Sequence, residues 1–249
     1  MEEGEIEEVL GKLESEFSRG NYEAAKILGF WKTVNAAKKN PKLAAAFGER
    51  IGRIDKLLFE SKAWVKLGYR TGTVIELTGA VLGFIFLYLG TRSTGTESTL
   101  FYTASSLILT TALHPISHVV AAWLTGIKFH FYFLNGPLLF EPTLKVDYAT
   151  YVKTPARMRV LFHLAGAINS VLMTFFVLIV ALLDSNASGT TKTVLAIIWL
   201  FTTASEAFPL IFTRLGMPKI LFADFRKSDS YRALREWRIW KNRIRSEGL

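Results

Sequence analysis

Four long apolar stretches between residues 71 and 215 constrain the fold of this chain more than any other feature. Each is long enough to cross the roughly 30 Å of hydrocarbon in a bilayer, and they lie near 71–91, 98–125, 157–183 and 192–215. Most charged residues lie outside this region. Because a soluble domain would spread its charges along the whole chain, the segregation predicts an integral membrane protein with polar ends.

We therefore expect a mainly α membrane protein with four transmembrane helices. Its predicted parts are a cytoplasmic helical cap, a four-span membrane domain and a basic amphipathic cytoplasmic tail, at 1–70, 71–215 and 216–249. The cap holds about three amphipathic helices, one of which begins after the break at Asn40-Pro41.

The connection at 126–156 differs from the short polar loops between the other spans. Its aromatic run 129–133 is followed by Asn135-Gly136-Pro137 and then by the apolar run 138–140. Asn-Gly between apolar runs is typical of a β-hairpin. We expect a small membrane-associated β element here, between the second and third spans, with 143–146 as a further short strand.

The distribution of basic residues predicts the orientation in the membrane. Of the 30 Lys and Arg, all but Arg92 and Lys192 fall in the two polar ends, in the 126–156 loop or at the adjoining ends of spans. Basic residues near spans favour the cytoplasmic side. The chain is thus expected to be a multi-pass protein of the cell membrane, with both termini in the cytoplasm.

The terminal segments carry two further predictions. The acidic start of the chain lacks the basic and apolar regions of a cleaved signal peptide. Residues 231–245 form an amphipathic pattern in which Trp237 and Trp240 share one face, flanked by basic residues that include Arg235, Arg238 and Lys241. This pattern is typical of a helix on an anionic leaflet, so we expect the lipid bilayer as a partner and no nucleic acid.

Ionisable side chains within spans mark function by default because their burial in lipid is costly. Away from the basic residues at their ends, the predicted spans contain five: Glu76, His114, His118, His163 and Glu206. His114 and His118 are four residues apart, so both imidazoles lie on one helical face and can reach one metal ion. The alternative is a pair of polar residues hydrogen-bonded inside a bundle. The absence of cysteine excludes a thiolate site.

The predicted depths of these residues agree with a shared site. At about 1.5 Å per residue from the cytoplasmic end of each span, His118 and His163 lie about 10 Å deep, Glu206 about 13 Å and His114 about 16 Å. All four fall in the inner half of the bilayer, so they can converge if spans two, three and four touch.

The order of motifs resembles the site-2 protease family of intramembrane zinc metalloproteases. A His-x-x-x-His span is followed by Gly126, the aromatic β element, a basic segment at 155–159 and a span that reads Ala165-Gly166-Ala167-Ile168-Asn169. The family has a His-Glu-x-x-His helix, a membrane-associated β element and an Ala-Gly-Pro-x-x-Asn span, and its site opens toward the cytoplasm. The resemblance covers roughly residues 98–215.

The chain departs from the family pattern at the catalytic positions. Pro115 stands where the family has its general base, a glutamate, so the usual proton acceptor is missing. Glu206-Ala207-Phe208-Pro209 occupies the place of an Asn-x-x-Pro element, and no Asp-Gly follows it to supply the third metal ligand. Asp224 and Asp229 come later, expected at or outside the membrane surface. Glu206 is thus the favoured third ligand, with His163 as the alternative.

Three hypotheses for function follow. Loss of the glutamate favours a non-catalytic pseudo-enzyme that binds transmembrane helices of client proteins as a scaffold or regulator, with Asn169 retained in the substrate cleft. The second is an active zinc metalloprotease with a rearranged site of His114, His118 and either Glu206 or His163, performing intramembrane proteolysis. The third is a small transporter or lipid-handling protein. Whether one zinc ion is bound, and whether the chain forms homo-oligomers, stay open at this stage.

Overall fold

A computed structural model describes residues 1–61, 65–135, 141–217, 219–220, 223–224, 226 and 228–247. The chain divides into two compact units, each built from segments that are distant in the sequence. One unit contains 70–121 and 160–236, and the other contains 1–69, 122–159 and 237–249. Each unit is described by itself below.

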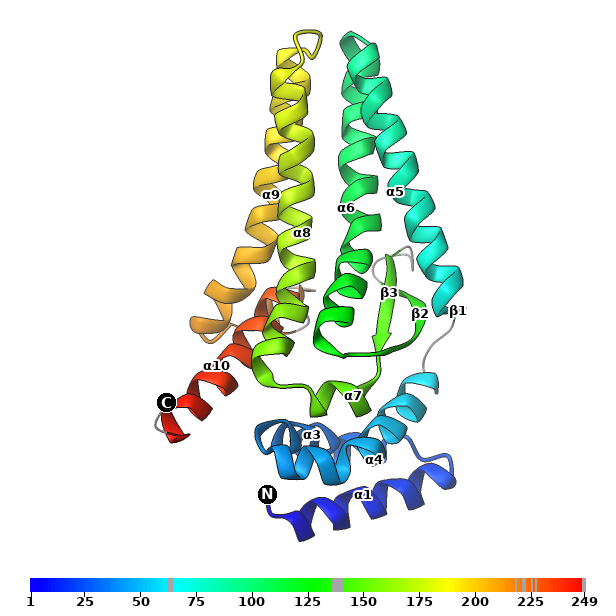
Figure 1. Cartoon of the computed structure of the whole chain (residues 1–249), viewed down its shortest axis with the longest axis vertical. Helices are drawn as coiled ribbons and strands as arrows, with labels where there is room; N and C mark the ends of the chain where they lie inside the picture. Colours follow the sequence, from blue (N-terminus) through cyan, green and yellow to red (C-terminus); the bar gives the residue numbers. More distant parts are fainter. Residues whose placement is uncertain are drawn as a thin grey trace. The chain divides into compact units, whose positions relative to one another are not determined.

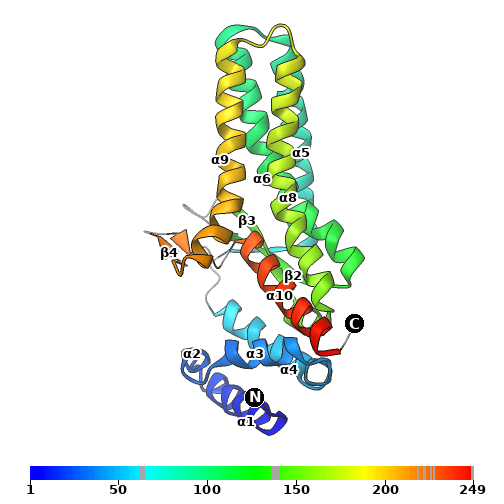
Figure 2. The ribbon, with the colours of Figure 1, turned by 90° about the vertical axis from the view of Figure 1, so that its left-hand side faces the viewer.

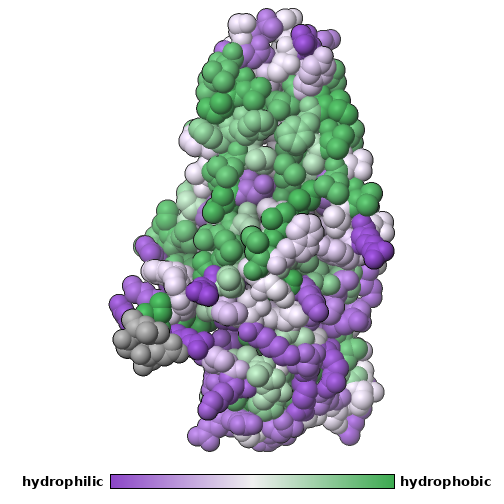
Figure 3. All heavy atoms as spheres, in the orientation of Figure 1, coloured by the Kyte–Doolittle hydropathy of each residue, from purple (hydrophilic) through white to green (hydrophobic). Residues whose placement is uncertain are grey.

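Four long helices dominate the first unit. They run side by side in both views (Figures 1 and 2), and they are α5 (Tyr69–Arg92), α6 (Gly95–Thr125), α8 (Ala156–Leu183) and α9 (Gly189–Arg214). All four are long and apolar enough to cross a membrane, the shortest having 24 residues. Hydrophobic side chains gather over them in Figure 3, with hydrophilic ones at the end that holds the short connections. The expectation of a mainly α chain with four helices able to cross a membrane is confirmed.

Polar contacts join the helices at the end with the short connections. Tyr102 on α6 donates its hydroxyl hydrogen bond to Asp184, just after α8, at 2.9 Å. Ser188 caps α9 by accepting a hydrogen bond from the Thr191 backbone N–H at 3.1 Å. The Tyr102 ring also belongs to an apolar cluster with Leu109, Val177 and Leu195, all almost fully buried.

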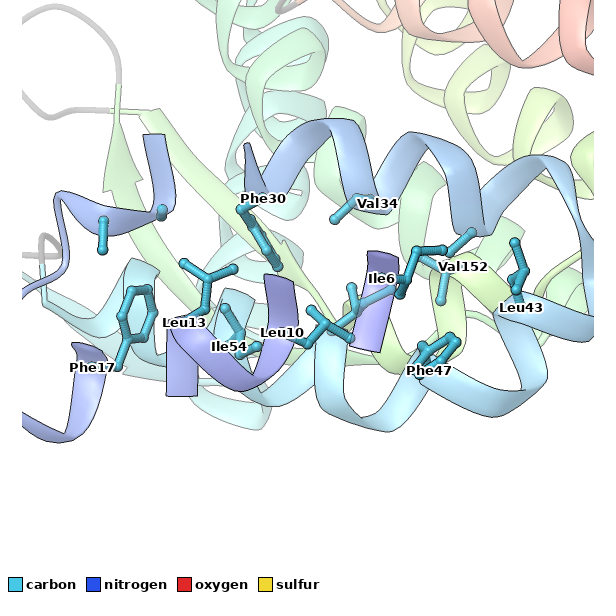
Figure 4. Close-up of a cluster of buried hydrophobic side chains, with 14 residues drawn as sticks. Ile6, Leu10, Leu13, Phe17, Phe30, Val34, Leu43, Phe47, Ile54 and Val152 are labelled. Atoms are coloured by element: carbon cyan, nitrogen blue, oxygen red, sulfur yellow. The ribbon is translucent and has the colours of Figure 1, made fainter. Parts of the chain in front are cut away.

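The other unit begins with the N-terminal helices. These are α1 (Glu3–Ser18), α2 (Ala24–Ile27), α3 (Phe30–Lys39) and α4 (Pro41–Glu60), one more than the sequence indicated. Asn40 ends α3 and caps α4, accepting a hydrogen bond from the Lys42 backbone N–H at 3.0 Å, as the Asn-Pro break predicted. Their apolar faces meet in one core that includes Ile6, Phe30 and Val152 (Figure 4).

A three-stranded antiparallel sheet and a short helix complete this unit. The sheet has the order β1 (Lys66–Gly68), β2 (Phe129–Asn135), β3 (Glu141–Val146), and α7 (Tyr148–Lys153) follows it. The predicted small β element is therefore present. The predicted turn at 136–137 and the apolar run 138–140 lie outside the described residues, and the strand that pairs with β2 includes 143–146. Close contact of Gly52 on α4 with Ala149 joins α7 to the N-terminal helices.

The last helix, α10 (Asp229–Glu247), confirms the helical character of the tail. Two short strands, β4 (Lys219–Ile220) and β5 (Ala223–Asp224), precede it and pair with each other. Asp229 and the first turns of α10 belong to the unit of the four long helices.

Candidate metal centre

Two histidines on α6 form the base of the site. His114 and His118 lie one turn apart on the same face, and their ring centroids are 5.0 Å apart. Pro115 lies between them inside the helix, so the helical spacing of the pair survives the proline. The sequence predicted this shared face, and the structure brings both rings to the same carboxylate.

Hydrogen bonds on the far side of each ring determine which nitrogen can bind a metal. His118 Nδ1 lies 3.0 Å from the carbonyl oxygen of Phe162, which only accepts, so Nδ1–H donates. His114 Nδ1 lies 2.9 Å from Ser170 Oγ, whose own hydrogen is donated to the Gly166 carbonyl at 3.2 Å. Both imidazoles therefore turn Nε2 toward the site, which is the ring nitrogen that metal-binding histidines offer the ion when Nδ1–H donates to the protein.

Asp229 supplies the third donor atom. Its Oδ2 lies 2.8 Å from His118 Nε2 and 3.2 Å from His114 Nε2. The three candidate ligand atoms all lie within 4.8 Å of one another, so they could hold one metal ion. Because a carboxylate oxygen only accepts, these contacts are favourable either when each Nε2 carries a proton or when one cation takes the place of those protons. The donor set therefore fits a divalent metal.

Gly166 on α8 provides the space in which these atoms converge. A methyl group at this position would lie 2.4 Å from His118 Nε2 and 2.8 Å from Asp229 Oδ2. Both distances are far below van der Waals contact, so a side chain cannot share this volume with the three donor atoms. The small-residue run 165–167, which the sequence indicated as part of a motif, thus makes room for the site.

His163 holds the carboxylate of Asp229 in position. Its Nδ1 lies 3.2 Å from Asp229 Oδ1, and because a carboxylate accepts, Nδ1–H donates and Oδ2 is left for the ion. Asp229 is also the first residue of α10, where the helix dipole favours negative charge. Burial alone would raise the pKa of Asp229, but the imidazoles of His118, His114 and His163 hold it well below its usual range.

The other site residues predicted from the sequence are not among the three candidate ligands. Glu206 on α9, the favoured third ligand, accepts a hydrogen bond from Ser230 Oγ and lies next to the group of three donors. Asn169 on α8 is partly buried, and its Nδ2 has no hydrogen-bond partner among the described residues. On α10, Trp237 and Trp240 are 40% and 36% exposed.

Asp229 is the site residue that sequence reasoning missed. It is separated from His118 by 111 residues, and it follows the apolar stretch of α9, so it was expected at or outside the membrane surface. One signal was available: an acidic residue at the start of an amphipathic helix has its charge stabilised there and its side chain oriented by the helix.

Comparison of the chain with protein-family models, with curated proteins and with solved structures found no match. The site is therefore interpreted from its own geometry and chemistry.

Proposed function

We propose that this chain is an intramembrane zinc metallopeptidase of the site-2 protease type. The observation that carries the proposal is the convergence of His114 Nε2, His118 Nε2 and Asp229 Oδ2 on one point between helices long enough to cross a membrane. Two imidazoles and one carboxylate are typical of catalytic zinc sites, where a fourth position stays open for the reaction. This donor set supports the catalytic hypothesis over the non-catalytic one favoured by the sequence.

The residues around the donors have separate tasks in this proposal. His114, His118 and Asp229 would hold the zinc ion, which as a Lewis acid would polarise a peptide carbonyl. Ser170 and the Phe162 carbonyl orient the two imidazoles, and His163 orients Asp229. The Nδ2 of Asn169, which has no hydrogen-bond partner among the described residues, would donate to the backbone of a substrate segment.

We also propose an orientation of the chain in the membrane. The concentration of basic residues in the polar ends and the 126–156 loop supports a cell-membrane protein with both termini in the cytoplasm. The exposed Trp237 and Trp240, with Lys241 Nζ 5.0 Å from the Trp237 ring centroid, support contact of α10 with an anionic leaflet.

Pro115 favours a second candidate function, a non-catalytic protein that binds transmembrane helices of clients. The α6 position that holds a glutamate in the His-Glu-x-x-His motif has no proton acceptor here. Such a protein would use the same helices and Asn169 without cleaving the bound segment.

The first test is the zinc content of the full chain, purified in detergent without a metal-affinity step. We expect near one zinc ion per chain in the parent protein and loss of the metal in His114→Ala, His118→Ala and Asp229→Ala. His130→Ala is the matched control, because His130 lies on β2, outside the site, and should leave the zinc content unchanged.

Cleavage of a fluorescently labelled single-span peptide then separates the two candidates. Zinc with cleavage that the His118→Ala variant lacks supports the peptidase. Zinc without cleavage, together with binding of the peptide, supports the client-binding protein. A parent protein that contains no zinc and gains none on dialysis against it would overturn the metallopeptidase proposal.

A further inference from the structure

A stripe of small residues brings α5 against α6 in a regular antiparallel register. A methyl group at Gly79 would lie 3.1 Å from Ala112 Cβ, and one at Gly83 would lie 2.7 Å from Leu109 Cδ2. A methyl group at Gly90 would likewise lie 3.0 Å from Tyr102 Cδ2. Seven residues along α5, from Gly90 to Gly83, correspond to seven along α6, from Tyr102 to Leu109, and the next four, to Gly79, correspond to three, so contacts nearer the start of α5 lie nearer the end of α6.

This register puts Glu76 level with Pro115. Glu76 lies three residues before Gly79, and Pro115 lies three residues after Ala112. Glu76 belongs to the buried stripe of α5, which consists of Gly72, Glu76, Ala80, Gly83, Leu87 and Gly90. Its side chain thus enters the bundle from α5 at the level where a His-Glu-x-x-His helix would present its own glutamate from α6.

The carboxylate of Glu76 is buried, and one of its two oxygens is unsatisfied among the described residues. The residue is 3% exposed, and its Oε1 has no hydrogen-bond partner among the described residues. The imidazole of His114 lies near enough to interact electrostatically with its carboxylate. Burial of a carboxyl group without a hydrogen bond costs free energy that an alanine or leucine at the same place would not. Because its burial is unfavourable, a carboxyl group near the candidate ligand His114 indicates a role in the chemistry of the site.

We propose that Glu76 is the proton acceptor of the site and that the catalytic carboxylate has moved from α6 to α5. The inference rests on the proposed peptidase function and names a residue for it that the motif pattern alone does not indicate. Glu206 is the competing carboxylate, but its Oε2 accepts a hydrogen bond from Ser230, which ties it to α10.

The proposed step is a hydrolysis with Glu76 as the proton carrier. A water molecule attacks the peptide carbonyl carbon, its proton passes to the Glu76 carboxylate, and the carbonyl electron pair moves to oxygen. As the tetrahedral species collapses, the C–N bond breaks and Glu76 returns the proton to the departing nitrogen. The products are one carboxylic acid and one amine, and Glu76 ends as the carboxylate that it was at the start.

The test compares Glu76→Gln with the parent protein in three measurements on the full chain in detergent. Zinc content should stay near one per chain, because Glu76 is not a ligand. Cleavage of the labelled peptide should fall by about 100-fold or more, the usual effect of losing a general base. Acetohydroxamate, whose acidic proton such a base accepts, should bind about 10–100-fold more weakly by calorimetry.

Matched variants make the result specific. Glu97→Gln, an exposed change in the first turn of α6, should alter none of the three quantities. Glu76→Asp should keep part of the cleavage because it keeps a carboxylate. Glu76→Gln/Pro115→Glu should recover cleavage, since the register makes the two positions neighbours, and this recovery would not follow from a merely structural role.

Three outcomes would overturn the inference. Cleavage and hydroxamate binding in Glu76→Gln within about threefold of the parent would show that another group accepts the proton. Loss of zinc from Glu76→Gln would make Glu76 a ligand instead. A larger loss in Glu206→Gln than in Glu76→Gln would transfer the role to Glu206. A parent protein without zinc is a different result, because it contradicts the proposed function itself.

Discussion

Gly166 leaves no room for a side chain at the centre of the metal-binding group. In Gly166→Ala, the new methyl group would meet His118 Nε2 at 2.4 Å, so the imidazole or the helix must move. We expect zinc affinity to fall at least about tenfold, as it does when groups that position ligands are disturbed. Competition with a fluorescent zinc chelator measures this affinity.

Gly189→Ala is the control for this prediction. Nothing lies within 4 Å of the added methyl group at Gly189, which begins α9 in the same unit. It should leave zinc affinity unchanged. Equal affinities in Gly166→Ala and the parent would mean that the three donors do not bind zinc in the arrangement described.

The ion pair of Glu14 with Arg50 predicts a pH dependence in the N-terminal helices. Arg50 Nη2 donates to Glu14 Oε2 at 2.7 Å, and this hydrogen bond lowers the pKa of Glu14 against the opposing effect of burial. A lowered folded-state pKa adds stability above the unfolded value of 4.5, and the contribution disappears as the pH falls through the folded pKa. Because the pair is partly exposed, we expect only about 0.5 kcal/mol.

Hydrogen–deuterium exchange of α1 amides in the full chain checks this expectation. Glu14→Gln should speed exchange relative to the parent at pH 7, and the difference should become smaller at pH 3, after correction for intrinsic rates. Glu3→Gln, an exposed change on the same helix, serves as the control. A difference between Glu14→Gln and the parent that is equal at both pH values would contradict the assignment.

At the level of elements, a buried ion pair joins β3 to α4. Lys145 donates to Asp55, and the two residues are 7% and 2% exposed. The Lys145 ammonium also lies 4.7 Å from the Phe59 ring centroid. Burial raises the pKa of Asp55 even though Lys145 opposes the shift. Burying the Asp55 carboxylate or the Lys145 ammonium alone would therefore destabilise the fold, whereas each charge compensates the other when both are present.

A double-mutant cycle measures the coupling within this pair. Asp55→Asn leaves the ammonium buried without its partner and should destabilise the sheet and α4 by about 3–5 kcal/mol. Asp55→Asn/Lys145→Met removes both charges and should cost clearly less. Hydrogen exchange of β3 amides gives the free energies of opening. If the effects of Asp55→Asn and of Lys145→Met alone add up to the effect of the double change, the pair is not coupled.

The helix α10 combines two roles along its length. Its first residue, Asp229, supplies a donor atom, while Ser230, Ala233 and Glu236 are buried. Trp237 and Trp240, on the apolar face that the sequence predicts to meet the membrane, are 40% and 36% exposed. Exposed tryptophans beside basic residues are what a helix at a membrane surface requires.

At the scale of the whole molecule, the positive-inside pattern predicts the sidedness of every connection. The chain contains no cysteine, so single-cysteine variants need no prior removal of native thiols. Glu3→Cys and Asn242→Cys should react with a membrane-impermeant maleimide only after the cells are opened. Ser185→Cys, in the short loop between α8 and α9, should react in intact cells. Labelling of Ser185→Cys and Glu3→Cys from the same side would contradict the predicted topology.

Much of the fold was predictable because local sequence dictates it. A long apolar run in lipid must satisfy its backbone hydrogen bonds within itself, so each predicted span became one helix with ends within about three residues of the expected ones. The β element was predictable from its aromatic runs, and α4 from the Asn-Pro break. The number of N-terminal helices was not, because α2 is a single turn of four residues.

The candidate metal centre, too, was only partly predictable from the sequence. The spacing of His114 and His118 by itself determined that both imidazoles share a face, because helical periodicity is a local property. Only the tertiary structure decided that Asp229 meets them, that His163 turns toward Asp229, and that Glu76 lies level with Pro115. Such contacts depend on how helices pack through small residues such as Gly83 and Gly166, and packing between distant segments has no periodic signature in a single sequence.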